Sequence, residues 1–172
     1  MKRIAVFPGS FDPFTIGHEA IARRALSLFD EIIIAIGANA LKKNYYSLAT
    51  RTEMISRVFS NEPRIRIDNY EGLTVDYCIR SGAGYLIRGL RTSADFEFER
   101  AIAQVNRVLA PNVESVFLLT VPEHSHINSS IVRDIIRSGG DASQFVPSSI
   151  NLSDFKGGNL NLSEDIEVDN IH

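Results

Sequence analysis

The residues with the clearest chemical potential lie in one loop near the start of the chain, residues 7–18, which read FPGSFDPFTIGH. The loop joins an apolar run to a segment with helical periodicity. A strand-to-helix turn of this kind can direct unpaired backbone N–H groups and the positive end of a helix dipole at an anion. His18 falls in the first turn of the expected helix and could donate to the same anion. The loop is therefore predicted to bind phosphate.

This loop differs from the two commonest phosphate-binding motifs. It does not read G-x-x-x-x-G-K-[ST], and it does not read G-x-G-x-x-G. The sequence therefore argues against a P-loop NTPase and against an ordinary dinucleotide-dependent oxidoreductase.

Four further groups of polar residues follow or adjoin expected strands. They are residues 42–43 (KK), residues 88–91 (RGLR), Glu99 and residues 124–130 (HSHINSS). Because the carboxyl ends of parallel strands meet at one edge of a sheet, we expect these groups to converge on one crevice with the opening loop. The positive charges among them suit a small phosphorylated ligand.

The elements that must position these residues follow from an alternation of apolar runs and helical patterns. This alternation predicts an α/β fold: a Rossmann-like, doubly wound, five-stranded parallel sheet with helices on both faces. A capping box is predicted at residues 50–53, TRTE. The expected strands are residues 4–7, 32–36, 65–69, 85–87 and 115–120, and the expected helices are residues 19–29, 50–59, 75–81, 95–109 and 130–137.

Length and charge divide the chain of 172 residues into a main domain, residues 1–150, and a C-terminal tail, residues 151–172. The tail holds five acidic residues and one basic residue, whereas the main domain is close to neutral. That balance does not suit a general nucleic-acid binder. The acidic tail is either disordered or packed on a neighbour through its apolar residues.

The single cysteine, Cys78, excludes an internal disulfide and is consistent with a reducing compartment. We expect a cytoplasmic protein with no membrane span, because no run of 18 apolar residues exists. Cys78 is expected to be a buried thiol. A zinc site formed by His18, His124 and His126 is not expected, since no cysteine or closely spaced partner accompanies them, and no protein metal ligand is predicted.

Residues 9–18, GSFDPFTIGH, resemble the G-[ST]-F-D-P-x-T-x-G-H signature of the nucleotidyltransferases. Residues 87–91 (IRGLR), 94–99 (ADFEFE) and 125–130 (SHINSS) resemble the phosphopantetheine adenylyltransferase family. The resemblance covers roughly residues 3–148, so that the main domain is expected to be a nucleotidyltransferase domain.

The resemblance implies transfer of AMP from ATP to 4′-phosphopantetheine, which yields 3′-dephospho-coenzyme A and pyrophosphate in the penultimate step of coenzyme A synthesis. It also implies Mg²⁺ accompanying ATP, coenzyme A as a candidate inhibitor, and a homo-oligomer, by resemblance a hexamer.

Residue roles also follow from the resemblance. His18 is the expected transition-state donor, Lys42 and Arg88 bind phosphopantetheine, Ser10 lies between the two substrates, and Thr74 lies near the pantetheine arm. The expected ATP-binding residues are Ser10, Phe11, His18, Gly89, Leu90, Arg91, Glu99, His124, Ser125, His126, Ile127, Asn128, Ser129 and Ser130.

Three alternatives stay open. The acceptor could be another phosphorylated molecule, such as nicotinate mononucleotide or glycerol 3-phosphate, or the chain could be a non-catalytic nucleotide-sensing module. Arg88 and Arg91 could also form structural ion pairs with residues 95 or 97. Three residues depart from the family pattern: His124 where Trp or Tyr is frequent, Asn128 in place of serine, and Asp134 in place of glutamate.

Overall fold

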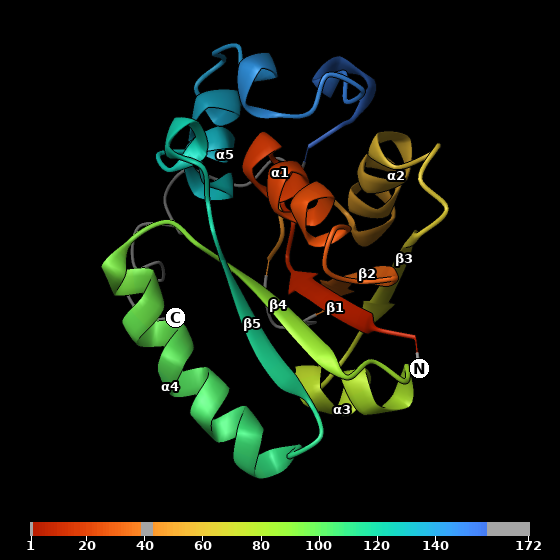
Figure 1. The fold of residues 1–172 in the computed structure, drawn as a ribbon. Helices are drawn as coiled ribbons and strands as arrows, with labels where there is room; N and C mark the ends of the chain where they lie inside the picture. The colour runs from red at the N-terminus through yellow and green to blue at the C-terminus, as the bar shows by residue number, and fades with distance from the viewer. Residues whose placement is uncertain (1, 39–42, 158–172) are drawn as a thin grey trace.

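The computed structural model describes residues 2–38 and 43–157. Its centre is a five-stranded parallel sheet with the strand order β3-β2-β1-β4-β5 (Figure 1). The doubly wound α/β fold predicted from the alternating pattern is confirmed. The strands are β1 (Ile4–Gly9), β2 (Glu31–Gly37), β3 (Ile65–Tyr70), β4 (Tyr85–Leu90) and β5 (Glu114–Leu119).

Helices cover both faces of the sheet, with α1, α2 and α5 on one face and α3 and α4 on the other (Figure 1). No helix in the described part of the chain has the length and apolarity needed to cross a membrane. The α-helices are α1 (Ile16–Ala25), α2 (Leu48–Val58), α3 (Thr74–Arg80), α4 (Ser93–Leu109) and α5 (Ser129–Arg137), and the 3₁₀ helices are η1 (Pro122–His124), η2 (Ser143–Phe145) and η3 (Leu152–Asp154).

The core consists of two apolar clusters separated by the sheet. In β2, Ile32, Ile34 and Ile36 face α1 and α2, whereas Ile33 and Ala35 face α3. Side chains alternate between the faces of a strand, and both faces of a parallel sheet are covered, so the whole strand reads as an apolar run. The predicted burial of the single cysteine, in α3, is confirmed.

The helices begin earlier than the sequence pattern predicted. The capping box predicted at residues 50–53 is wrong, because α2 begins at Leu48 and its N-cap is Ser47, whose hydroxyl accepts a hydrogen bond of 3.1 Å from the N–H of Thr50. The other helices start one to three residues before their predicted positions. Polar cap residues satisfy the free N–H groups of a first turn, which apolar periodicity does not register.

The strands β1 and β4 separate at their carboxyl ends. β1 stays paired with β2 as far as Gly9, and β4 stays paired with β5 as far as Leu90. Between themselves, however, β1 and β4 pair only as far as Val6 and Leu86. The space beyond lies at the topological switch point of the sheet, where α/β folds of this kind bind their ligands.

The chain continues past the sheet domain onto α2. Asp154, in η3, forms an ion pair of 2.6 Å with Arg57 of α2, and Phe155 packs beside it. The first part of the predicted C-terminal tail, residues 151–157, therefore packs on the same chain. Residues 158–172 lie outside the described residues.

Candidate active site

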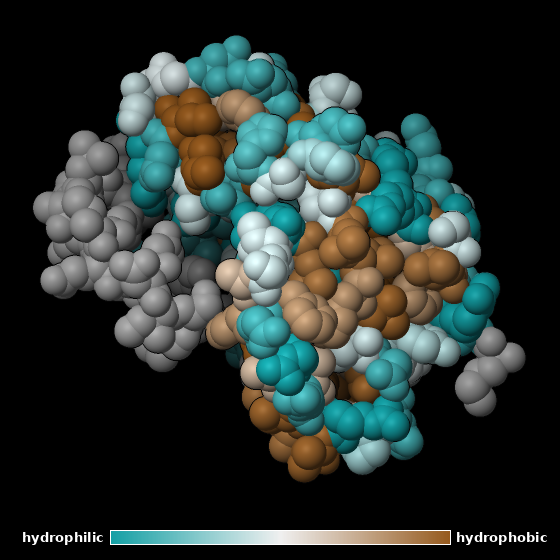
Figure 2. Space-filling model, turned by 60° about the vertical axis from the view of Figure 1, so that its left-hand side comes forward, coloured by the Kyte–Doolittle hydropathy of each residue, from teal (hydrophilic) through white to brown (hydrophobic). Residues whose placement is uncertain are grey.

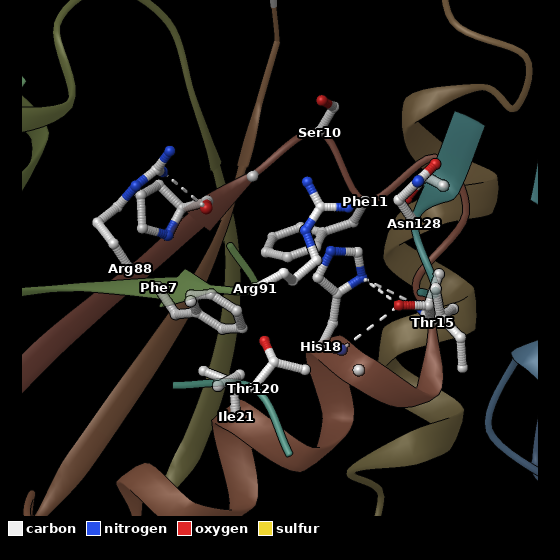
Figure 3. A pocket seen from close by; sticks show the side chains of 16 residues that line it. Phe7, Ser10, Phe11, Thr15, His18, Ile21, Arg88, Arg91, Thr120 and Asn128 are labelled. Atoms are coloured by element: carbon white, nitrogen blue, oxygen red, sulfur yellow. Dashed lines mark hydrogen bonds between the residues drawn. The ribbon is translucent and has the colours of Figure 1, made fainter. Parts of the chain in front are cut away.

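A cavity of about 270 Å³ opens where β1 and β4 separate. Its walls come from the end of β1 and the loop after it, the first turns of α1, the end of β4, and the start of α5 (Figure 3). Of the four groups predicted to converge on the opening loop, residues 88–91 and 124–130 reach this cavity, whereas Glu99 and Lys43 do not line it and residue 42 lies outside the described residues. The predicted site residues that line the cavity are Ser10, Phe11, His18, Arg88, Gly89, Arg91, Ile127, Asn128 and Ser129.

His18 is held in the cavity by the cap of its own helix. Thr15 is the N-cap of α1, and its backbone N–H donates to Nδ1 of His18 at 3.0 Å, while its hydroxyl lies 3.1 Å from the same nitrogen. An amide N–H can only donate, so Nδ1 is the acceptor and Nε2 carries the ring proton. The ring points into the cavity (Figure 3), which gives the cavity one oriented N–H donor.

The surroundings of His18 keep its imidazole neutral. Burial, together with the smaller effect of the positive charge of Arg91, lowers the pKa of His18 to about 4. The rings of Phe11 and Phe14 lie 5.1 Å and 5.4 Å from the imidazole, measured between centroids. His18 is therefore uncharged at physiological pH and acts as a hydrogen-bond donor through its Nε2–H group.

The shape of the loop after β1 depends on a close contact between the Phe11 ring and Gly9. Phe11 adopts a left-handed backbone conformation with φ 49°, and its ring folds back over Gly9. A Cβ atom at Gly9 would lie 2.8 Å from that ring, closer than real Cβ contacts allow. Glycine at this position lets the Phe11 ring reach both the sheet and His18.

Arg91 brings positive charge to the same cavity from the end of β4. Its guanidinium pairs with Asp95 in the first turn of α4, with Nε 3.1 Å from the carboxylate. The same carboxylate accepts from the backbone N–H of Arg91 at 3.0 Å. The ion pair that the sequence left open thus exists. It orients Arg91 at the cavity wall, since the residue also lines the cavity.

Arg88 and Glu99 form a paired unit rather than two separate ligand groups. Nε of Arg88 donates to Glu99 at 2.7 Å, and a second guanidinium nitrogen donates to the other carboxylate oxygen. Glu99 is buried and does not line the His18 cavity. The structure therefore shows Glu99 as the ionic partner of Arg88, and its expected contact with ATP stays a prediction.

Two further cavities adjoin the first. One of about 510 Å³ is bordered by Ser10 and Arg88 from the first cavity and by Asn44 and Tyr70 on its far side. Another, of about 250 Å³, is lined by Arg88 and Thr74 and by the inner side of α4. The shared residues place Ser10 and Arg88 at the junction between cavities. Lys42 lies outside the described residues.

The segment before α5 reaches the cavity through its last residues. Asn128 is the N-cap of α5, and its side-chain oxygen accepts from the N–H of Ile131 at 2.9 Å. Asparagine and serine are both favoured N-caps, so the departure from the family pattern preserves the helix start. The hydroxyl of Ser129 donates to the carbonyl of Pro13 at 2.9 Å and joins α5 to the opening loop.

Several predicted ATP contacts do not line the His18 cavity. The hydroxyl of Ser125 donates to the carbonyl of Pro122, and the hydroxyl of Ser130 accepts from Arg133. Nδ1 of His124 is buried without a hydrogen-bond partner in η1. The expected residues outside the lining are Leu90, Glu99, His124, Ser125, His126 and Ser130.

The sequence interpretation missed cavity residues of two kinds. Thr15 is a threonine directly before an expected helix, and its cap preference could have identified it. Thr120 enters from the end of β5, and no sequence signal marks it. The lining residues without an individually predicted role are Phe7, Pro8, Gly9, Thr15 and Gly17, which belong to the predicted phosphate-binding loop, and Ile21 and Thr120, which lie outside it.

The donor set of the cavity favours anions over metal ions. No aspartate or glutamate lines it, and the described residues contain no cluster of three or more His, Cys, Asp or Glu side chains that could hold a metal ion. A divalent cation prefers oxygen ligands, so one that accompanies a nucleotide here would be held by the phosphates and water.

Comparison with known proteins places this geometry in a family. The cytidylyltransferase-like family profile matches residues 6–135. A phosphopantetheine adenylyltransferase from Flavobacterium psychrophilum is 54% identical over 150 residues, which are 87% of this chain and 99% of that protein. One from Leptospira biflexa is 49% identical over 147 residues, which are 86% of this chain and 92% of that protein.

A solved structure shares the fold at lower identity. It is the bifunctional NMN adenylyltransferase/ADP ribose pyrophosphatase from Francisella tularensis complexed with AMP and manganese, with a TM-score of 0.65 and 18% identity. The match covers 91% of this chain and 47% of that one. The cavity at the switch point, the capped His18 and these similarities agree, and the chain belongs to the cytidylyltransferase-like family and, within it, to the phosphopantetheine adenylyltransferases.

Proposed function

We propose that the protein transfers AMP from ATP to 4′-phosphopantetheine in the cytoplasm, giving 3′-dephospho-coenzyme A and pyrophosphate. The observation that carries this proposal is the junction of two cavities at Ser10 and Arg88, with the oriented Nε2–H of His18 on one side. A two-substrate phosphoryl transfer needs its reactants held in line at such a junction. The relatives that share up to 54% identity bear the name of this activity.

The reaction is a direct displacement at the α-phosphorus of ATP. An oxygen of the acceptor phosphate attacks that phosphorus, the bond to the β-phosphate oxygen breaks, and pyrophosphate leaves with the bonding electrons. A phosphate monoester has a second pKa of about 6, so the nucleophile is already ionised at neutral pH and needs no general base. This matches a cavity in which donors and cations prevail and no carboxylate is present.

His18, Arg91 and the start of α5 stabilise the charge that develops. The Nε2–H of His18 donates to an α-phosphate oxygen as its negative charge grows, and the neutral ring makes this donation independent of pH above about 5. Arg91 and the N-terminus of α5, which is capped by Asn128, bind the remaining phosphates. Mg²⁺ enters as part of the MgATP substrate.

Arg88 binds the acceptor phosphate with its orientation set by Glu99. The cavity lined by Thr74 and α4 is the proposed place of the pantetheine arm. Coenzyme A carries the same arm, so we propose that it competes at this site as an inhibitor.

The activity is tested by mixing the protein with MgATP and one acceptor at a time and measuring pyrophosphate release. We expect release with 4′-phosphopantetheine, and much slower release with nicotinate mononucleotide or glycerol 3-phosphate. Preferred turnover of another acceptor would reassign the substrate. ATP binding without turnover of any acceptor would instead indicate a nucleotide-sensing module.

We also propose that the protein is a homo-oligomer, by resemblance a hexamer, assembled through α4 and the edge of β5. Figure 2 shows an apolar area on this side of the molecule. Val108 is 80% exposed and Val105 is 58% exposed, although α4 is otherwise amphipathic. Contiguous exposed apolar surface of this kind is typical of interfaces. The other exposed apolar side chains of α4 and of the end of β5 are Phe96, Phe98, Ile102, Leu109 and Leu119.

A further inference from the structure

The segment of residues 151–157, here named the C-terminal clasp, packs against α2 and the edge of the site. It lies outside residues 6–135, which the family profile matches. Its first residue, Asn151, caps η3 by accepting from the N–H of Ser153 at 3.2 Å. Leu152 and Phe155 pack against the larger apolar cluster of the domain. The clasp is therefore an integral part of the fold as far as Gly157.

Arg57 of α2 anchors the clasp in two ways. One guanidinium nitrogen donates to Asp154 at 2.6 Å, and the guanidinium carbon lies 4.6 Å from the centroid of the Phe155 ring. A second guanidinium nitrogen donates to Glu53 on the same helix at 2.6 Å. An exposed ion pair alone contributes little to stability, but here the cation–π contact and the partly buried side chains of Leu152 and Phe155 hold the same short segment.

The end of the clasp lies directly on the ring of Tyr45. A Cβ atom at Gly157 would be 2.1 Å from a ring carbon of Tyr45, so no side chain fits there without displacing the ring. On other sides the ring contacts Tyr46, at 4.8 Å between centroids, and the guanidinium of Arg137, at 5.5 Å from its centroid. The clasp thus forms one of the contacts that hold the partly buried ring of Tyr45.

Tyr45 is tied through its backbone to the loop that carries Ser10. The N–H groups of Tyr45 and Tyr46 donate to the two carboxylate oxygens of buried Asp12, at 2.7 Å and 2.9 Å. Arg51, which is 2% exposed, donates to the carbonyls of Tyr46 and Ser10 at 3.1 Å and 2.6 Å. This buried network leaves the Tyr45 backbone little freedom to move independently of the opening loop.

Asn44 adjoins Tyr45 in sequence and borders the cavity of about 510 Å³ together with Ser10 and Arg88. The His18 cavity, in contrast, has no lining residue from the clasp or from residues 43–47. A change at the clasp should therefore act on the acceptor side of the site directly, through Asn44, and on the nucleotide side only through the opening loop, so its larger effect is expected on the acceptor.

We propose that the C-terminal clasp is a positioning element for acceptor binding, which acts through Tyr45 on the cavity wall at Asn44. The inference rests on the proposed function for the identity of the acceptor. Gly157, Phe155 and Asp154 are positioning residues, because they contact neither substrate and act through another side chain.

The test uses the full chain with Gly157→Val, which displaces the Tyr45 ring. The matched control is Gly84→Val, because a Cβ atom at Gly84 meets no atom within 4 Å. We expect Gly157→Val to raise the KM for 4′-phosphopantetheine roughly fivefold or more, with kcat and the KM for ATP within about twofold of wild type. In a Tyr45→Ala background, Gly157→Val should add nothing further, since the coupling passes through the ring.

A second measurement separates the clasp from the proposed activity. Hydrogen exchange of the Tyr45 and Tyr46 amides, which bond to Asp12, should accelerate in Gly157→Val and not in Gly84→Val. Unchanged exchange rates at these two amides would contradict the proposed coupling between the clasp and Tyr45. Faster exchange with an unchanged KM for the acceptor would overturn its role in positioning. Absence of turnover in the wild-type protein would overturn the proposed function, and with it the acceptor part of the inference.

Discussion

The backbone N–H of Thr15 donates a hydrogen bond of 3.0 Å to Nδ1 of His18. The N-cap residue of α1 therefore also decides which ring nitrogen of His18 carries the proton. The neutral ring then presents Nε2–H to the cavity. The same contact that caps α1 therefore also orients the N–H donor of His18.

Replacement of His18 tests the donor role. We expect His18→Ala to lower kcat about a hundredfold or more, because removal of one donor to a developing oxyanion typically costs about 3 kcal/mol. The KM for ATP should change much less, since the contact strengthens mainly in the transition state. Steady-state kinetics with MgATP and 4′-phosphopantetheine measure both, and a thermal unfolding curve checks that the variant is folded. Nearly full turnover would remove His18 from this role.

The charge state of His18 gives a prediction about pH. Its pKa is lowered to about 4, whereas an unfolded chain would titrate near 6.5. Between these values the unfolded state binds the proton and the folded state does not, so the free energy of unfolding contributed by this group decreases as the pH falls from 6.5 to 4. The loss is about 3 kcal/mol at most, from 1.36 kcal/mol per pKa unit.

NMR titration of the His18 ring resonances measures the same property directly. At pH 6 we expect a neutral imidazole with the proton on Nε2. A His18 midpoint near 6.5 would contradict the proposed desolvation.

The Arg88–Glu99 pair predicts an effect on the acceptor side. Glu99→Gln removes a buried carboxylate and leaves the arginine without its ionic partner, so we expect a loss of about 1–3 kcal/mol in the free energy of unfolding and a higher KM for 4′-phosphopantetheine. Glu97→Gln, on the same helix, breaks an exposed pair with Arg100 and should change the unfolding free energy by less than about 1 kcal/mol. Equal effects of the two variants would show that burial of the pair has no consequence.

The exposed face of α4 predicts the oligomeric state. We expect Val105→Glu to shift the protein to a smaller species in sedimentation velocity, because a charge would have to be buried in the proposed interface. Ile79→Glu is the matched control, since Ile79 is 59% exposed but lies on α3. A wild-type protein that sediments as a monomer would contradict the proposed assembly.

Some of the site could be predicted because its signals are local. The loop of residues 9–18 combines glycine and threonine with a histidine at a fixed spacing, and the structure places Ser10 and His18 at the cavity as expected. The short apolar runs and the helical periodicity of the segments between them likewise predicted the five parallel strands and the helices that connect them. The helix starts were less accurate, since caps such as Ser47 depend on one side-chain hydrogen bond rather than on periodicity.

The sequence by itself determined the α/β fold class, the phosphate-binding loop and the family, because each depends on residues that are neighbours in the chain or repeat with the period of a strand or helix. Only the tertiary structure decided that Glu99 pairs with Arg88, that burial and Arg91 lower the pKa of His18, and that residues 151–157 pack on Tyr45. These properties depend on burial and on contacts between distant segments. Packing sets both, and neither has a local signature in the sequence.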